Sequence, residues 1–377
     1  MCTSSPVLRL AVALLAAAAL AAQAPMLDAA ALPTRLEASA DGLPPAAVAT
    51  LVLGLEPVHV VLPGGAVLGA RPDVLAGLAV VDAAGGVELA TPLVSGLCAG
   101  LSFLVQVAAL SPDGTFATTP VRVVRAPAPG DAADVYLLFG QSNAQGHAPA
   151  EELPDALRRP LPNGRLWDIG AGTFAAVRGD GDRCGPELAL LRGLGGGERT
   201  VWLVKLAVDM TPLGPGEGPM DEWGVAAGEL YAVLLAVTDA AAADLRAVGL
   251  VPRVRGIAMM QGESDATDVA LAHGYGERLQ HLVRQLRQDL LARRLAADDA
   301  TPFVIGRIAR ELAREVFPWT EVVRAAQDAV ASATPACALV DTDGLALQED
   351  RTHFATDGVV GLGRAFAAAL LRLASRR

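Results

Sequence analysis

Basic residues are scarce in this chain of 377 residues: Lys205 is the only lysine, the formal net charge is −11, and no basic block occurs. Nucleic acids and anionic membrane surfaces attract proteins through clustered positive charge. The composition therefore argues against either of them as a partner. Hydrophobic residues make up 52% of the chain, so apolar surface is ample for a core, and the length predicts two domains.

Cysteine is also rare, and the spacing of the four cysteines excludes a tight metal cluster. Cys98, Cys184 and Cys337 lie far apart in the sequence, whereas a structural zinc site needs closely spaced ligands. In an oxidising compartment Cys184 and Cys337 could pair, which the sequence leaves open. For each of the three, a buried structural thiol is the favoured interpretation.

Long apolar runs are lacking except at the N-terminus, where residues 10–22 follow Arg9. This run is shorter than the roughly 20 residues that span a bilayer. Ala22-Gln23-Ala24 offers small residues for cleavage, so residues 1–24 are predicted to be a signal peptide. The alternative is an uncleaved anchor, which Pro25 favours slightly. We expect export to the periplasm or out of the cell, and no membrane span once the signal is removed.

Residues 25–128 show short apolar stretches separated by turn residues, without long helical periodicity. Val58 to Leu62 precede Pro63-Gly64-Gly65, and Leu101 to Ala109 precede another turn. This spacing predicts a small β-sandwich-like domain that ends in a linker. Few aromatic residues there could stack on sugar rings, so a structural or interaction domain is favoured over a carbohydrate-binding module.

Over residues 129–377 the sequence pattern changes to an alternation of expected strands and helices. This pattern predicts an α/β domain whose parallel sheet is covered on both faces. Ligands of such domains bind outside the carboxyl ends of the strands, so the residues directly after each strand are the candidates. The expected strands lie at residues 135–139, 201–206, 254–260, 303–306 and 338–340, and the expected helices near residues 186–192, 226–248, 275–286, 319–331 and 356–373.

Gly140-Gln141-Ser142-Asn143 follows the first of these strands. A serine at a strand end is a candidate nucleophile, provided that an imidazole accepts its proton. The block is not the Gly-x-Ser-x-Gly elbow, because Ala144 stands where that motif has glycine. The alternative is a serine that caps a helix.

Two further blocks offer donors for a developing oxyanion. Gln261, which begins Gln-Gly-Glu-Ser-Asp after a later strand, carries a side-chain amide, and Gly185 has a free backbone N–H at an expected helix start. The alternative for the first block is an ordinary strand-to-helix turn.

Only five histidines are available to act as a general base. His353 lies three residues after Asp350, a spacing that lets the carboxylate reach the ring. A solvent-exposed histidine in a capping loop is the alternative. His147 lies near Ser142 in the sequence but has no carboxylate near enough to orient it, so it is expected to line the substrate cleft.

The order of these blocks resembles that of the SGNH-type hydrolases. Within them it looks like the branch of the sialate O-acetylesterases and the acetyl xylan esterases of carbohydrate esterase family 6, over about residues 131–377. The resemblance implies a three-layer, flavodoxin-like α/β fold and a triad of Ser142 as nucleophile, His353 as general base and Asp350 as its partner. It also implies an oxyanion hole of the Ser142 and Gly185 N–H groups and the Gln261 side chain. Substrate-binding roles fall by the same resemblance to Gln141, Asn143 and Glu263.

The chain departs from the family pattern around the pocket. Met259 and Met260 stand where an aromatic residue is frequent, and residues 208–213 lack the usual glycines. Ala144-Gln145 replaces a methionine-alanine pair. These changes leave the three triad residues in place, but they do not determine which sugar or acyl group the substrate pocket accepts.

The sequence therefore predicts an exported serine esterase that removes O-acetyl groups from acetylated carbohydrate, of sialate or xylan type, without a metal or an organic cofactor. One alternative is an esterase for lipid, aryl or peptidoglycan esters. Another is a glycan-binding protein whose hydrolase domain is inactive.

Overall fold

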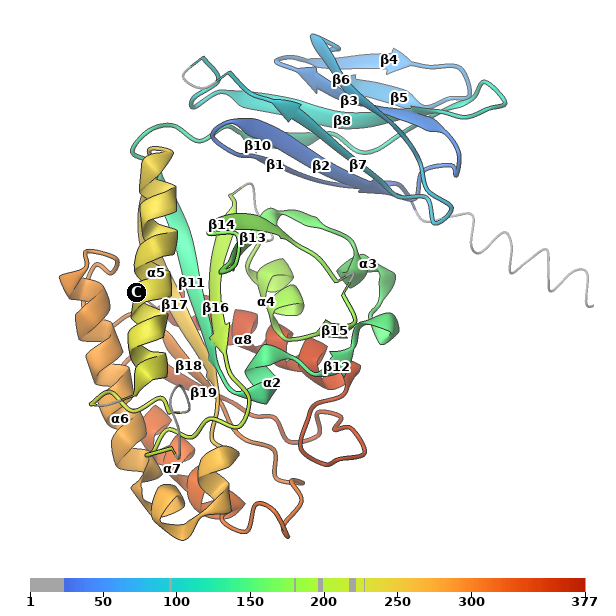
Figure 1. Cartoon of the computed structure of the whole chain (residues 1–377). Coiled ribbons are helices and arrows are strands. Elements are labelled where there is room, and N and C mark those ends of the chain that lie inside the picture. The colour runs from blue at the N-terminus through green and yellow to red at the C-terminus, as the bar shows by residue number, and fades with distance from the viewer. Residues whose placement is uncertain are drawn as a thin grey trace, which may run out of the picture. The chain divides into compact units, whose positions relative to one another are not determined.

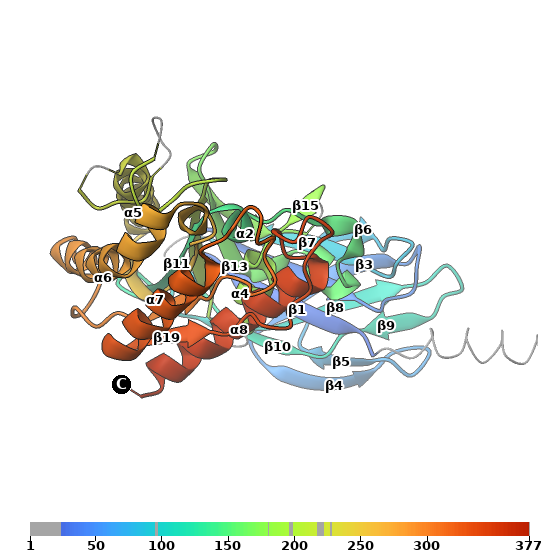
Figure 2. The same ribbon diagram turned by 90° about the horizontal axis from the view of Figure 1, so that it is seen from below.

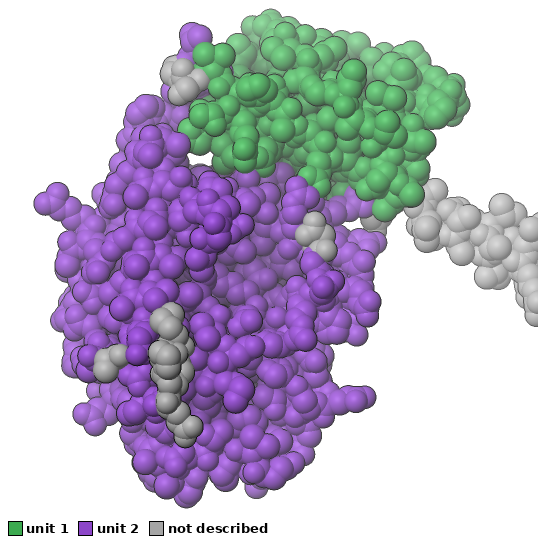
Figure 3. All heavy atoms as spheres, viewed as in Figure 1, with its two compact units in different colours: residues 1–94, 101–126 green, residues 95–100, 127–377 purple. Residues whose placement is uncertain are grey.

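The computed structural model describes residues 24–94, 97–179, 181–195, 199–216, 222–226 and 228–376. The chain divides into two compact units, one of residues 1–94 with 101–126 and one of residues 95–100 with 127–377 (Figure 3). The expected signal peptide, apart from Ala24, lies outside the described residues. Within the described ranges, no helix is long and apolar enough to cross a membrane.

Unit 1 consists of antiparallel strands in two main sheets (Figure 1). Its strands are β1 (Met26–Ala31), β2 (Arg35–Asp41), β3 (Val48–Gly54), β4 (Pro57–Val61), β5 (Val67–Ala70), β6 (Val74–Val80), β7 (Val87–Pro92), β8 (Ser102–Leu110), β9 (Phe116–Thr118) and β10 (Arg122–Arg125). One sheet has the order β1-β2-β7 and the other β10-β8-β3-β6, with β9 beside β8. Leu36 from the first sheet and Leu51 and Val107 from the second are 0% exposed. The predicted β-sandwich is confirmed.

Unit 2 is built on a sheet of strands β11 (Ala132–Gly140), β13 (Leu161–Asp168), β14 (Thr173–Val177), β16 (Val201–Ala207), β17 (Val251–Met260), β18 (Phe303–Gly306) and β19 (Cys337–Val340). Their order is β14-β13-β16-β11-β17-β18-β19, and only β14 pairs antiparallel. The five expected strands take the flavodoxin-like order, with the second along the chain on one side of the first and the others on its other side. The predicted α/β fold is confirmed. The edge pair β13 and β14 was not predicted.

Helices cover both faces of this sheet (Figures 1 and 2). They are α4 (Glu187–Leu194), α5 (Glu229–Ala247), α6 (Val269–Ala292), α7 (Thr320–Ala333) and α8 (Thr356–Ala374). α4 packs with α8 on one face, and α5, α6 and α7 lie on the other. Because both faces are covered, the central strand is apolar throughout its second half, with Leu137, Leu138 and Phe139 at 0% exposure.

The switch in strand order creates a crevice at the carboxyl end of β11. The chain leaves β11 for β16 on one side, whereas β17 lies on the other side, and such points are where ligands bind in open α/β sheets. Short elements follow β11 and β17 there: α2 (Ser142–Gln145), β12 (Ala148–Pro149), η1 (Ala150–Glu152), α3 (Asp155–Arg158), β15 (Arg183–Cys184) and η2 (Ser264–Thr267).

The disulfide that the sequence left open is not formed. Cys98, Cys184 and Cys337 are all free thiols. Burial raises the pKa of Cys184 to about 11 and that of Cys337 to about 11. Since the thiolate is the reactive form, both thiols are unsuited to act as nucleophiles near neutral pH.

Candidate active site

The candidate nucleophile lies on a tight turn that only glycine permits. Gly140 has a φ of +145°, and a Cβ atom built there would lie 1.9 Å from the carbonyl oxygen of Met260. The turn leads directly into α2, of which Ser142 is the first residue. Its backbone N–H therefore lacks an intrahelical acceptor and is available to a ligand.

The Asp350 carboxylate makes two hydrogen bonds with the candidate general base and a third with the residue before it. His353 Nδ1 lies 2.6 Å from Asp350 Oδ2, and the backbone N–H groups of Thr352 and His353 donate to Asp350 Oδ1 at 2.9 and 3.0 Å. Partial burial alone would raise the pKa of Asp350, but these hydrogen bonds outweigh it and hold the pKa below its usual value. A carboxylate that stays ionised keeps the His353 proton on Nδ1 and the lone pair on Nε2.

Ser142 and His353 border one cavity of about 900 Å³ at the carboxyl ends of the strands. Gln141 borders it as well. Asn143, Gly185, Gln261, Glu263 and Asp350 are not among the residues that border it. The remaining lining residues are His147, Asp209, Met210, Pro212, Pro215, Gly216, Ser264, Thr267, Asp268, Leu271, Val316, Phe317 and Thr352.

His147 borders the cavity as expected, but the expectation that no carboxylate orients it is wrong. Asp209, which follows β16, places Oδ1 2.8 Å from His147 Nε2. Arg183 places a guanidinium nitrogen 2.6 Å from His147 Nδ1. Both ring nitrogens of His147 are thus engaged by protein groups, so His353 is the better placed of the two to accept a proton from Ser142.

Asn143 connects the serine turn to the histidine loop. Its amide donates to Glu263 Oε1 at 2.7 Å and to the Thr352 carbonyl at 3.0 Å, and its carbonyl oxygen accepts from the Phe354 N–H at 3.0 Å. Asn143 is 2% exposed and Glu263 1%. The structure therefore gives both side chains a positioning role, and the sequence prediction that they bind substrate finds no support in their location.

Burial also sets the protonation of Glu263. Desolvation raises its pKa, and the Asn143 hydrogen bond offsets only part of that effect. Above about pH 4.3 the unfolded chain loses this proton while the folded protein keeps it. The unfolded state then binds fewer protons, so the stability that this group contributes is present at low pH and is lost as the pH rises through the window above the ordinary value.

We expect Glu263→Gln to remove this pH dependence, because glutamine has no proton to lose. Each pH unit of the window costs the wild type about 1.4 kcal/mol. The difference in thermal midpoint, variant minus wild type, should rise as the pH increases above about 4.3. Glu321→Gln, a change of an exposed glutamate on α7, serves as the control. A difference in thermal midpoint that does not change with pH would contradict the raised pKa of Glu263.

The two glutamines of the site are held by buried contacts. Gln141 Oε1 accepts from the N–H groups of Gly262 at 3.3 Å and Ser264 at 3.2 Å. The Gln261 amide donates to Asp265 Oδ2 at 2.7 Å and to the Thr211 carbonyl at 3.1 Å, and Gln261 is 0% exposed. For Gln261 to donate to an oxyanion, its amide would first have to leave Asp265.

Gly185 is held by Glu187, which is in turn bound by the only lysine of the chain. The Gly185 N–H donates to Glu187 Oε1 at 3.2 Å, while Lys205 Nζ donates to Glu187 Oε2 at 2.7 Å and to the Gln145 carbonyl at 2.7 Å. Lys205 thereby joins the end of β16 to the last residue of α2 and to the start of α4. The long N–H···O distance at Gly185 makes this donor easier to redirect than the Gln261 amide.

Three contributors to the site were not given a role by the sequence. Asp209 and Lys205 lie in or just after β16, a strand end that the sequence did predict, so their position was a usable signal. Asp265, the last residue of the Gln-Gly-Glu-Ser-Asp block, is 0% exposed and accepts from the backbone N–H groups of Leu213 and Gly214 at 2.7 and 3.1 Å. It fixes the loop that carries Pro212 and Pro215 at the cavity.

Comparisons with known proteins show what the chain is similar to. Residues 185–372 match the model of a family described as carbohydrate esterase, sialic acid-specific acetylesterase. No curated protein matches. A solved structure from Arabidopsis thaliana is 21% identical with a TM-score of 0.51, and the match covers 65% of this chain and 99% of that one. NanS is 17% identical with a TM-score of 0.54, covering 66% and 99%.

Axe2, an acetylxylan esterase from Geobacillus stearothermophilus, is 15% identical, and the match covers 64% of this chain and 96% of that one. Its TM-score of 0.34 is too low to bear on the fold. Because their sequence identities are low, the matches to NanS and the Arabidopsis protein show similarity of fold and not of function. The family match supports an ester hydrolase that acts on carbohydrate.

Proposed function

Because residues 185–372 resemble the sialic acid-specific acetylesterases, a family of carbohydrate esterases, we propose that this protein is a serine esterase that removes O-acetyl groups from acetylated carbohydrate. The observation that carries the proposal is the state of His353. Its Nδ1 is held by Asp350 at 2.6 Å, and its ring borders the same cavity as Ser142. A serine acts as a nucleophile when such an oriented imidazole can accept its proton.

In the proposed reaction Ser142 Oγ attacks the acetyl carbonyl carbon while its proton passes to His353 Nε2. The tetrahedral intermediate then breaks its bond to the sugar oxygen, which takes the proton from His353. Water attacks the acetyl group on Ser142 and gives a proton to His353. When the second intermediate collapses, acetate leaves and the proton returns to Ser142. No step of this sequence draws on a metal or an organic cofactor.

The oxyanion needs donors at the start of α2 and α4. The Ser142 N–H is available, and the Gly185 N–H can turn from its long bond to Glu187 when a negative oxygen arrives. We assign Gln261 chiefly to positioning, because its amide is tied to Asp265 at 2.7 Å. Its part in the oxyanion hole rests on the family resemblance.

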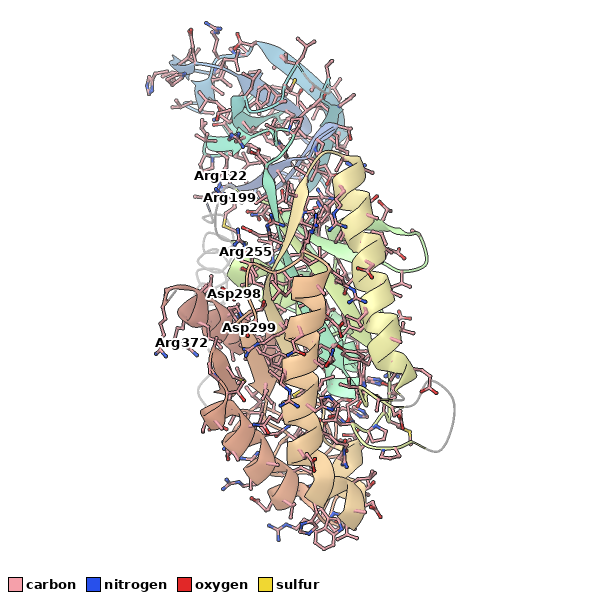
Figure 4. All side chains as sticks on the ribbon, turned by 90° about the vertical axis from the view of Figure 1, so that its left-hand side faces the viewer. Arg122, Arg199, Arg255, Asp298, Asp299 and Arg372 are labelled. Carbon is pink, nitrogen blue, oxygen red and sulfur yellow. The ribbon has the colours of Figure 1, made fainter. Side chains whose placement is uncertain are left out.

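The charges around the cavity favour an uncharged sugar. Asp209 and Asp268 border it, and none of the described residues that border it is lysine or arginine. Arg199 lies just before β16 and Arg255 midway along β17 (Figure 4), and neither is among the residues that border the cavity. Arg183 is not among the residues that border the cavity, but it contacts one of them, His147. A sugar carboxylate would meet two acids in the cavity wall.

We therefore expect a preference for acetylated xylo-oligosaccharide over O-acetylated sialic acid, by about tenfold or more in kcat/KM at low salt. The difference in kcat/KM between the two substrates should decrease at high ionic strength, because salt screens the repulsion between the substrate carboxylate and the two acids. Acetate release from both substrates, measured at low and at high salt, tests this. Equal rates at low salt would contradict it.

The function itself is tested by acetate release from p-nitrophenyl acetate, acetylated xylan and O-acetylated sialic acid, with p-nitrophenyl octanoate for comparison. A steep preference for acetate supports the sugar esterase, whereas efficient octanoate hydrolysis supports a lipid or aryl esterase. Glycan binding without turnover would support the inactive alternative. Export is proposed only on the pattern of residues 1–24.

A further inference from the structure

The ring of a second histidine lies against the candidate general base. The His147 and His353 rings have centroids 4.6 Å apart and planes inclined by only 16°. His147 comes from the segment after α2, and His353 from the loop before α8, so the stack joins two distant parts of the chain. Gln348 reinforces it by donating both to the His147 carbonyl and to the Phe354 carbonyl at 3.1 Å.

The partners of His147 fix where its proton lies. A guanidinium has only donors, so Arg183 must donate to Nδ1, which therefore carries a lone pair. The single ring proton is then on Nε2 and is donated to Asp209 at 2.8 Å. Protonating Nδ1 would require Arg183 to withdraw. His147 is thus held as a neutral ring in one tautomer.

We infer that His147 is a positioning residue, which presents a neutral aromatic face to His353 and so supports it as general base. The inference rests on the proposed esterase function. His353 becomes an imidazolium when it takes the proton of Ser142, and a neutral π-face beside a cation is attractive. An imidazolium at position 147 would instead place two like charges 4.6 Å apart.

A matched pair of substitutions at His147 distinguishes the effect of its aromatic face from the effect of its volume. His147→Phe keeps a flat aromatic ring on His353 but loses both nitrogens, whereas His147→Leu keeps apolar bulk without a π-face. We expect kcat for p-nitrophenyl acetate to fall about tenfold in His147→Leu and about threefold or less in His147→Phe, with KM nearly unchanged in both. Equal losses in the two variants, or no loss in His147→Leu, would overturn the inference.

A double substitution tests the role of Arg183. Arg183→Leu removes the donor to Nδ1, so His147 beside Asp209 is free to take a second proton, and kcat should fall about tenfold. Adding His147→Phe to Arg183→Leu should recover most of the lost kcat, because phenylalanine cannot be charged. A purely structural role for Arg183 would not be rescued in this way, and a double variant no better than Arg183→Leu would overturn the inference.

A spectroscopic readout keeps the inference testable apart from catalysis. ¹⁵N chemical shifts of the histidine rings at neutral pH, assigned with His147→Phe, should show His147 with an unprotonated Nδ1 in the wild type and a doubly protonated ring in Arg183→Leu. A doubly protonated His147 in the wild type would overturn it. If the wild type shows this tautomer but no Ser142-dependent esterase activity, the proposed function fails while the state of His147 stands.

Discussion

Ser142→Ala should lower kcat for p-nitrophenyl acetate by about 10⁶-fold, since the loss of a triad serine removes the acyl-enzyme route altogether. The residual rate would come from the oxyanion donors and from substrate binding. KM should change little, because Ser142 is 5% exposed and contributes mainly a reacting atom rather than binding surface.

A second serine on the same cavity provides the control. Ser264 borders the cavity and contributes its backbone N–H, not its hydroxyl, to the contact with Gln141. Ser264→Ala should therefore retain activity within about threefold. If Ser264→Ala lost as much as Ser142→Ala, or if Ser142→Ala kept most of the wild-type rate, Ser142 would not be the nucleophile.

The fold could be predicted because its signals are local. Runs such as Val135 to Phe139 are apolar at every position, which is what a strand covered on both faces requires. β13 was not predicted because its apolar run is broken by polar residues: Asn163 and Arg165 are buried there, where sequence alone suggests exposure. Their burial depends on neighbours from other parts of the chain.

The site could be predicted only as far as strand ends identify it. Position in the sequence led to Ser142, and the short Asp350 to His353 spacing led to a pair that the structure holds at 2.6 Å. The contacts of His147 with Asp209 and Arg183 cross between separate segments and leave no local pattern. The contact of Gln261 with Asp265 is local, four residues along the same block, but the block does not show that the turn after β17 brings the Asp265 carboxylate onto the Gln261 amide.

Asp350→Asn should lower kcat by about 10⁴-fold while leaving the fold intact. An asparagine amide in place of Oδ2 would face His353 Nδ1 as a donor, so the ring would turn its lone pair towards residue 350 and its proton towards Ser142. The base would then hold the wrong tautomer. Measured kcat and thermal midpoint, side by side, separate this loss from unfolding.

The second His–Asp pair of the cavity decides whether this loss is specific. Asp209→Asn makes the same chemical change beside His147, but there the asparagine oxygen can still accept from Nε2–H, because Arg183 continues to donate to Nδ1. We expect it to cost at most about tenfold, since His147 supports the base without exchanging a proton with substrate. If instead Asp209→Asn lost 10⁴-fold and Asp350→Asn little, the roles of the two histidines would be the reverse of those proposed, and His147 would be the general base.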